Sequence, residues 1–317
     1  MTRIGMSVLT LFFVVCFSTA AQSNLFSFST GSPDGKQGAL SRPAGPQGLE
    51  TETADDFALT QATVISTATI HGLIPVGSTV SNIASVEVEI YHIFPLDSDV
   101  SRTSGPPTFS TANVPTRVNS PSDHEISADT RDSNESTLSF VATEISDFQV
   151  QNTVIAGINK IPHQLTHGEG PASGEEVEID IAFNPPLFLP EGHYFFRPEV
   201  QISGGNFLFL SAPRPITSGT PFPAGTTDLQ AWIRNADLAP DWLRIGTDII
   251  GTGTFNMTFS LAGNSIPEAG TPGQANCHGK TVSAMAHEFT GIDASASTLG
   301  YSSVDALQDG ITGFCQQ

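Results

Sequence analysis

The chain has 317 residues, with 32 Asp and Glu against 12 Lys and Arg, which gives a formal net charge of −20 at pH 7. Such an acidic surface repels nucleic-acid phosphates and anionic lipids, so we expect neither nucleic acid nor membrane as a partner. Charged residues make up 14% of the chain, against roughly 25% in typical domains, and Gly, Pro, Ser and Thr are abundant, as in a turn-rich extracellular β protein.

The N-terminus is expected to be a signal peptide covering residues 1–21. Arg3 supplies a positive charge, residues 6–17 form an apolar run, and residues 18–21 are small, as signal peptidase requires. We place the cleavage after Ala21, with Ala20 as the second choice. The apolar run is shorter than the roughly 20 residues that span a bilayer. We therefore expect a secreted product without a membrane anchor, either extracellular or periplasmic.

Residues 22–263 carry the pattern of one β domain. Residues 86–93 and 177–183 alternate apolar and polar side chains with period two, which is typical of a strand with one buried face. The other predicted strands are residues 57–60, 64–70, 138–141, 148–155, 192–200, 207–210, 229–234 and 255–261. Turn signals such as Pro185-Pro186 and Gly204-Gly205 separate them. The pattern predicts an antiparallel β-sandwich.

A jelly roll is the preferred version of this sandwich, because residues 186–194 read as a strand, a tight turn and an aromatic strand. Residues 97–137 interrupt the pattern with a segment rich in Ser, Pro, Asp and Thr. A loop that long within a compact domain is either functional or mobile, and both alternatives stay open. Residues 129–135 resemble a calcium loop but lack the glycine and the terminal glutamate of an EF-hand.

The last part of the chain is expected to be helical. Residues 264–275 read as a linker, and residues 276–317 as a small helical domain. Val282, Met285, Ala286 and Phe289 recur with helical spacing, and Gly291 ends that pattern. Residues 302–305 match a capping box that opens a helix with an apolar face. A shorter helical piece, residues 294–299, fits between the two.

Two cysteines remain once Cys16 leaves with the signal peptide. In an exported protein, Cys277 and Cys315 most simply form one disulfide. Closing a loop of nearly 40 residues stabilises the folded state by roughly 3–4 kcal/mol in the chain-entropy model. Because domains as small as residues 276–317 usually need such a link, we predict that this disulfide closes the helical end.

Two places in the sequence are weighed as metal sites. Asp55 and Asp56 precede a predicted strand, and carboxylates at the edge of an extracellular sandwich often bind Ca²⁺. The alternative is that they cap a turn while Phe57 enters the core. His163 and His167 have metal-binding spacing, with Glu169 as a conceivable third ligand. Proline and glycine flank them, which favours a solvated loop. His287-Glu288 begins a zinc-protease motif whose second histidine is missing.

Both tryptophans lie close together in a polar stretch. Trp232, Arg234, Asn235, Asp241 and Trp242 combine two rings with hydrogen-bonding side chains, and exposed tryptophans of this kind stack on sugars. The alternative is that both rings belong to the core. Neither a GxSxG motif nor a Walker glycine loop is present, so no nucleophile or nucleotide site is predicted.

Several phrases together resemble a family of uncharacterised secreted bacterial proteins. They are ETADDFALT, VPTRVNSPSD, LTHGEGP, HYFFRPEV, LQAWIRNADLAPDWLRIGTDI and NCHGKTVSAMAHEF. The resemblance covers nearly the whole mature chain and implies export and a β-sandwich with a short cysteine-bounded helical tail. No activity is known for the family, so no functional residue is carried over. If the polar phrases converge in space, the candidate ligand-binding residues are Arg117, Asn119, Asp123, His167, Glu169, Arg234 and Asp241.

The sequence alone favours a secreted, non-catalytic binding or structural module whose ligand is a glycan, a surface polymer or a protein. The alternative is a secreted hydrolase acting on polysaccharide or ester substrates. An enzyme requires a concave pocket with converging titratable groups, whereas a binding module can present a flat aromatic strip. The shape of the molecule therefore discriminates between them. No cofactor is predicted apart from the candidate Ca²⁺.

Overall fold

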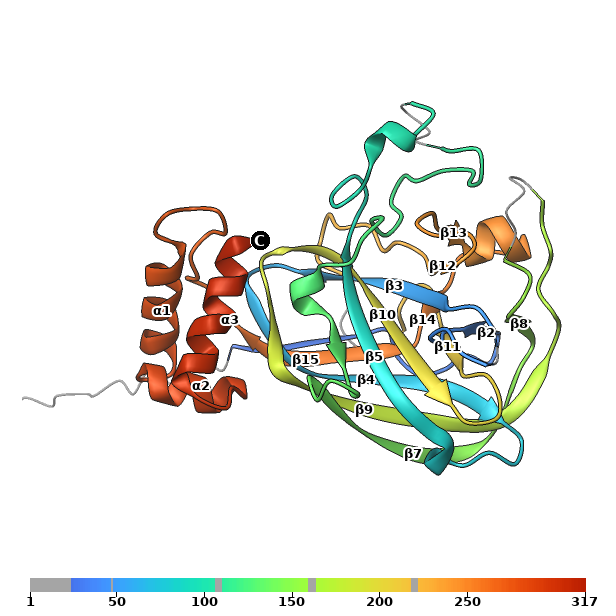
Figure 1. The fold of residues 1–317 in the computed structure, drawn as a ribbon, viewed down its shortest axis with the longest axis horizontal. Coiled ribbons are helices and arrows are strands. Elements are labelled where there is room, and N and C mark those ends of the chain that lie inside the picture. Colours follow the sequence, from blue (N-terminus) through green and yellow to red (C-terminus); the bar gives the residue numbers. More distant parts are fainter. Residues whose placement is uncertain (1–23, 47, 106–109, 159–163, 218–221) are drawn as a thin grey trace, which may run out of the picture.

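A computed structural model describes residues 24–317, except residues 47, 106–109, 159–163 and 218–221. The predicted signal peptide with Cys16, and the candidate ligand His163, lie outside the described residues. Figure 1 shows two β-sheets packed face to face, with a group of helices at one end. The prediction of a mainly β, antiparallel sandwich followed by a helical end is confirmed.

The strands of the described part of the chain form a nine-stranded and a six-stranded sheet. The larger sheet contains β1 (Leu25–Ser29), β2 (Gln37–Leu40), β4 (Thr63–Pro75), β7 (Leu138–Val150), β8 (Asn152–Val154), β9 (Ala172–Leu189), β11 (Leu208–Ala212), β14 (Asn256–Met257) and β15 (Phe259–Ser265). The smaller contains, in spatial order, β13 (Leu243–Arg244), β12 (Trp232–Asn235), β3 (Thr51–Leu59), β10 (Gly192–Ile202), β5 (Ile83–His92) and β6 (Arg131–Asp132). All pairings are antiparallel except that of β2 with β8.

In two runs of the chain, β3 to β5 and β9 to β11, successive strands alternate between the two sheets. The chain passes from β3 in the smaller sheet to β4 in the larger and back to β5, and it repeats this movement through β9, β10 and β11. This alternation is the connectivity of a jelly roll. Inward-facing residues such as Val88, Phe196 and Phe259 fill the space between the sheets and form the main core. The outward-facing residues of β3, β5 and β10 alternate with them, as the pleat of a strand requires.

The proline pair in the middle of β9 does not form the predicted turn. β9 runs through Pro185 and Pro186 without ending. In its ladder with β4, Ile65 pairs with Leu187 and Thr67 pairs with Ala182, so residues 183–186 bulge away from their neighbour. Proline has no N–H to donate to a ladder, and a bulge accommodates that loss. The turn comes later, between β9 and β10.

The segment 97–137 is partly regular where it is described. It contains two short 3₁₀ helices, η2 (Val100–Arg102) and η3 (Ser127–Asp129), and strand β6. A third 3₁₀ helix, η1 (Val80–Asn82), precedes β5, and a π-helix, η4 (Ile245–Ile250), follows β13 where the sequence predicted no helix. In Figure 1 the segment that follows β5 extends above β3 and β10, toward the strands β12 and β13.

The helical end comprises α1 (Cys277–Glu288), α2 (Ile292–Leu299) and α3 (Val304–Gln316). The predicted disulfide joins Cys277 to Cys315, whose Cα atoms are 5.8 Å apart. α3 begins after Ser303, whose hydroxyl accepts the N–H of Ala306 at 3.0 Å, one residue later than the predicted cap. None of the described helices is long and apolar enough to span a bilayer.

The helical end packs directly on the sandwich. Phe314 of α3 stacks on Phe188 of β9, with ring centroids 4.0 Å apart. Val64 of β4 belongs to the same hydrophobic cluster. At the C-terminus, the Gln317 side chain donates a 3.0 Å hydrogen bond to Asp129. The tail is therefore joined to the sheets by apolar contact as well as by the chain.

Candidate functional site

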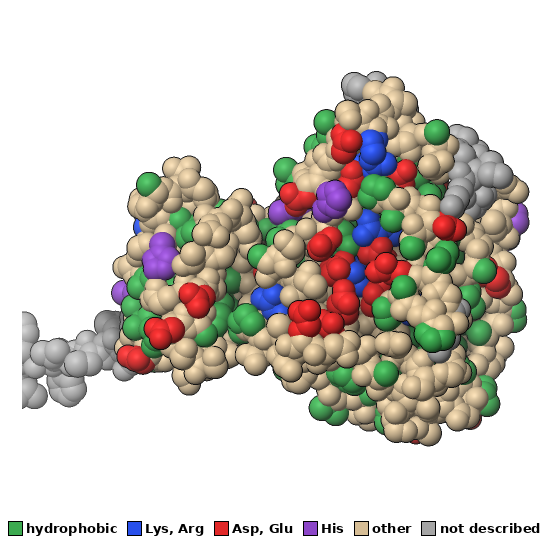
Figure 2. Space-filling view, in the orientation of Figure 1, with side chains coloured by type: hydrophobic (Ala, Val, Ile, Leu, Met, Phe, Trp, Pro, Cys, Tyr) green, Lys and Arg blue, Asp and Glu red, His purple; other side chains and the backbone are tan. Residues whose placement is uncertain are grey.

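The outer face of the six-stranded sheet carries an unusual density of charged side chains. They alternate with core residues along β3, β5 and β10, and Figure 2 shows acidic and basic groups gathered over these strands. The residues that make up this charged face are Glu52, Asp56, Glu87, Glu89, Tyr91, His193, Arg197 and Glu199. Most of these side chains are buried or partly buried, so their polar groups form ion pairs and hydrogen bonds with one another instead of with water.

Arg197 lies at the centre of the charged face and is fully buried. Its guanidinium is 3.3 Å from Glu52, 3.0 Å from Glu199 and 3.5 Å from Glu87, and it is paired also with Glu89. Four carboxylates exceed the charge that one guanidinium can neutralise. Burial raises the pKa of Glu199 to about 8 and that of Glu87 to about 7, because the ionised form is poorly solvated there.

Arg234 on β12 extends this network toward the loops. It donates hydrogen bonds to Glu52 at 2.9 Å and to the Tyr91 hydroxyl at 2.8 Å, and its guanidinium lies 4.3 Å from the centroid of Trp242. Burial alone would raise the pKa of Glu52, but Arg197 and Arg234 together hold it below its usual value. Arg234 is thus an interior residue of the network.

The two tryptophans are buried, which confirms the alternative that both rings are interior and rules out the exposed, sugar-stacking one. Trp232 is 1% exposed and Trp242 is 2% exposed. They pack with Phe195 and Tyr91 in a separate hydrophobic cluster on the outer side of the sheet. With so little of either ring exposed, neither forms a platform on which a sugar could stack, although Trp232 is one of the residues that line a cavity described below. Asn235, predicted beside them, accepts the N–H of Leu238 at 2.9 Å and so stabilises a turn.

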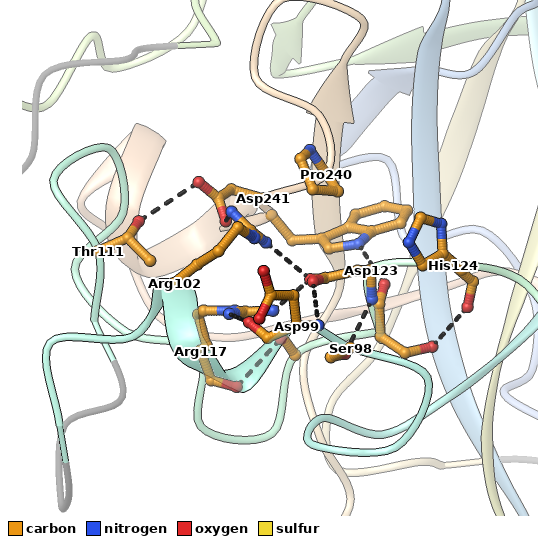
Figure 3. Close-up of polar contacts among 12 residues, drawn as sticks. Ser98, Asp99, Arg102, Thr111, Arg117, Asp123, His124, Pro240 and Asp241 are labelled. Carbon is orange, nitrogen blue, oxygen red and sulfur yellow. Dashed lines mark hydrogen bonds and ion pairs between the residues drawn. The ribbon is translucent and has the colours of Figure 1, made fainter.

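A set of ion pairs holds the long loop together and joins it to the connection between β12 and β13 (Figure 3). Arg102 donates to Asp123 at 2.9 Å and to Asp241 at 2.8 Å. Arg117 also pairs with Asp123 and donates to the carbonyl oxygen of Asp99 at 3.0 Å. Asp123 and Asp241 are buried, and a buried carboxylate is stable only when it is paired in this way. We call these residues the loop anchor.

The loop anchor holds a turn at the edge of a cavity. Between Arg117 and Asp123, Asn119 has a φ of 63°, a left-handed conformation that asparagine tolerates better than most residues. Thr116, Val118 and Asn119 line the cavity wall. Of the candidate residues in this loop, Arg117 and Asp123 therefore act as anchors, while Asn119 is placed where a ligand could reach it.

The cavity consists of two adjoining compartments, of about 580 Å³ and about 310 Å³. Both are lined by Asn119, Thr227 and Leu229, so they lie side by side, and we call the two together the loop groove. Hydroxyl, amide and charged side chains from several loops line it, including Thr60, Thr226, Arg214 and Gln230. Its size is within the range of small-molecule sites, roughly 300–1,000 Å³.

A histidine–aspartate pair lies at the wall of the larger compartment. His193 Nε2 is 2.5 Å from Asp56 Oδ2, and the same oxygen accepts the N–H of Leu229 at 3.1 Å. Burial raises the pKa of Asp56, although the hydrogen bond from His193 opposes the rise. In the smaller compartment, Asp228 lies 3.6 Å from Arg214, and burial raises the pKa of its carboxyl as well.

Asp55 and Asp56 do not form the calcium site that the sequence led us to consider. Asp55 points into the sandwich, where its Oδ2 accepts the N–H of Met257 at 2.7 Å. Asp56 points outward to His193. Because neighbouring residues of a strand face opposite sides of the sheet, the two carboxylates cannot hold one ion. Within the described residues, no group of three or more His, Cys, Asp and Glu side chains is arranged to hold a metal.

His167 and Glu169 belong to a different part of the molecule. The Glu169 carboxylate accepts the backbone N–H groups of residues 155–157, at 2.9, 3.0 and 2.5 Å. His167 Nδ1 lies 3.0 Å from the carbonyl oxygen of Ile250, in η4. Of the seven candidates proposed to converge, Arg117, Asp123, Arg234 and Asp241 share one network and Asn119 lines the adjacent groove. His167 and Glu169 do neither.

The sequence reasoning missed His193, Asp228 and Arg214. His193 is the first of four alternating residues, 193, 195, 197 and 199, that all face outward on β10. A polar residue at such positions is ordinarily solvated. For His193, the available signal is that the outward positions of β5 carry charges too, so that two neighbouring strands present charged side chains on one face of the sheet. Arg214 and Asp228 lie between β11 and β12 and have no such signal.

Comparison of the chain with protein-family models, with curated protein sequences and with solved structures finds no match. The resemblance to a secreted bacterial family therefore stays a prediction.

Proposed function

We propose that this protein is exported and binds an oligosaccharide or polysaccharide segment in the loop groove. The observation that carries the proposal is a pair of adjoining cavities, lined by polar side chains, whose common wall is held by buried ion pairs. Such a preformed site reduces the conformational entropy lost on binding. The leader-like N-terminus and the Cys277–Cys315 disulfide support export.

The chemistry of the lining favours a neutral, hydroxylated ligand. Thr60, Thr226 and Thr227 offer hydroxyls, and Asn119 and Gln230 offer amides. Each of these groups both donates and accepts hydrogen bonds, as sugar hydroxyls do.

The arginines of the groove favour the same class of ligand. Arg214 lies beside Asp228, and Arg244 is 2.7 Å from Asp248. Their charges are therefore offset within the protein. An anionic ligand such as a phosphate ester would have to compete with these carboxylates, so a neutral polymer fits the groove better.

The buried tryptophans argue for a groove rather than a flat platform. A module that binds crystalline or extended surfaces through an aromatic strip needs exposed rings, and Trp232 and Trp242 are both buried. Recognition would then rest on hydrogen bonds to the groove lining. We expect modest affinity for the glycan. We expect selectivity for its linkage or substitution pattern rather than for a polymer surface.

A glycan array followed by titration calorimetry on the mature protein tests this proposal. Asn119→Ala should weaken the binding of any glycan that the array identifies by about tenfold, because it removes an amide at the wall common to both compartments. Asn113→Ala is the matched control, since Asn113 is an exposed asparagine of the same loop that does not line the groove. Absence of any glycan binding, or equal losses in the two variants, would refute the proposal.

A further inference from the structure

The loop groove holds a paired histidine that glycan binding alone does not require. His193 lines the larger compartment, and its side chain is 21% exposed. Asp56, which accepts from its Nε2, is 1% exposed and is fixed in turn by the N–H of Leu229. The described residues provide no hydrogen-bond partner for the other ring nitrogen, Nδ1. A carboxylate that holds one imidazole nitrogen fixes the tautomer and leaves the second nitrogen free to accept a proton.

We propose that His193, positioned by Asp56, is the general base of an esterase that removes acyl groups from a glycan bound in the loop groove. This inference rests on the proposed function, because the groove must first hold the glycan. His193 is then the catalytic residue, and Asp56 is a positioning residue that acts through it.

The nucleophile of this reaction is water. Among the described residues that line the two compartments there is neither a serine nor a cysteine, and none of the lining threonines is hydrogen-bonded to His193. No side-chain hydroxyl or thiol of these residues is therefore paired with the base as a nucleophile of acyl transfer requires. A histidine held by a carboxylate is a suitable base for water. Asn119 and Thr227, at the wall common to both compartments, supply the kinds of donor that stabilise a developing oxyanion.

The surroundings favour an ester over the other bonds of a glycan. Glycosidases place two carboxyl groups on either side of the bond that they cleave. Two carboxyl groups line the groove, those of Glu191 and Asp228, but they belong to different compartments and Asp228 is paired with Arg214. The Asp56 carboxylate is buried behind His193. Phosphate-ester hydrolysis requires cationic groups for the phosphoryl oxygens, and both arginines of the smaller compartment lie beside carboxylates. A neutral carboxylic ester, such as an O-acetyl group on a sugar, needs neither arrangement.

The step balances without a cofactor. His193 Nδ1 takes a proton from water, and the water oxygen forms a bond to the acyl carbon. The bond between that carbon and the sugar oxygen then breaks. The imidazolium returns its proton to the departing sugar oxygen. The products are a carboxylic acid and a free sugar hydroxyl.

Acetate release from O-acetylated xylan by the mature protein tests the proposal, with p-nitrophenyl acetate as a second probe. His193→Ala should lower the rate at least about 100-fold, and added imidazole should restore part of it, which a structural role would not produce. Asp56→Asn should lower the rate without rescue by imidazole. His71→Ala is the matched control, because His71 is also 3.0 Å from a carboxylate, Glu176, and is similarly exposed, but lies on the other sheet.

The outcomes separate this inference from the proposed function. Glycan binding by calorimetry without acetate release would overturn the esterase and leave the binding proposal standing. Acetate release that persists in His193→Ala, or in His193→Gln if the alanine variant does not fold, would overturn the role of His193. Loss of acetate release in His193→Ala with glycan binding retained would support both proposals, because the variant removes the base and leaves the groove lining that binds the glycan.

Discussion

Arg117 and Asp123, six residues apart in the chain, form a buried ion pair across the base of the turn that carries Asn119. The ion pair therefore holds the two ends of this turn together. Arg102 then links the same carboxylate to Asp241, which follows β12 in a distant part of the sequence. A charge network in the interior of the loop thereby fixes the wall of a groove that opens at its surface.

The loop anchor should be essential to stability. Asp123→Asn leaves Arg117 buried without a carboxylate, and breaking a buried pair in this way costs about 3–5 kcal/mol. We expect a loss of that order in the free energy of unfolding measured with urea. Glu135→Gln, which changes an exposed carboxylate of the same segment, should change it by less than about 0.5 kcal/mol. Equal effects of the two variants would show that the anchor is not required.

Stability should fall as the pH rises from about 5 to about 8. The folded protein holds protons on Glu87 and Asp129 up to a pKa of about 7, and on Glu199 up to about 8. Unfolded carboxyls release theirs near pH 4 to 4.5. The folded state therefore binds more protons between these values, and each group contributes stability that is lost as the pH rises through its folded pKa.

Urea titrations at pH 5 and pH 8 measure this effect, which we expect to be on the order of a few kcal/mol. Glu199→Gln is the informative variant, because the amide mimics the protonated carboxyl and carries no charge. This variant should reduce the difference between the free energies of unfolding measured at pH 5 and at pH 8. A protein that is more stable at pH 8 than at pH 5 would contradict the assignment of raised pKa values on the charged face.

The disulfide should stabilise the helical end without acting on the groove. Replacing both Cys277 and Cys315 by serine removes a link across 38 residues, and we expect a loss of roughly 3–4 kcal/mol. Limited proteolysis should cut first within residues 277–316. Glycan binding should persist in the variant at temperatures where the sandwich stays folded. If the variant lost glycan binding together with the fold of the helical end, the helical end would be shown to support the groove.

Calcium should not stabilise the protein through Asp55 and Asp56. Their side chains point to opposite sides of β3, and each is already engaged with a neighbour. Thermal unfolding of a metal-stripped sample should therefore be unchanged by millimolar Ca²⁺. A stabilising shift that disappears in Asp56→Asn would contradict the arrangement described.

The sequence was informative where a pattern has one physical cause. Period-two alternation in residues 86–93 identified β5, because one face of a sandwich strand must be apolar. Two cysteines left outside the predicted signal peptide were sufficient to predict the Cys277–Cys315 disulfide. Helical spacing located α1 and α3 to within a few residues. The proline pair was misread because a turn and a bulge both tolerate a missing N–H.

The site was harder to predict, for a different reason. Period-two alternation shows which side chains of a strand point away from the core. It does not show whether those side chains are exposed to solvent or covered by a loop. Arg234 and Trp242 therefore appeared as surface residues, while the loop anchor buries both. His193 gave no local signal at all. Its partner Asp56 is 137 residues away in the chain, and only the pairing of β3 with β10 brings them together.

Hydrogen exchange measured with and without the glycan selected by the array locates the binding site on the molecule. We predict slower exchange of backbone amides in residues 116–120, 191–193 and 226–230, which border the loop groove, and little change in the nine-stranded sheet. Protection of β4 and β9 instead, with none around Asn119, would show that the glycan does not bind in the loop groove.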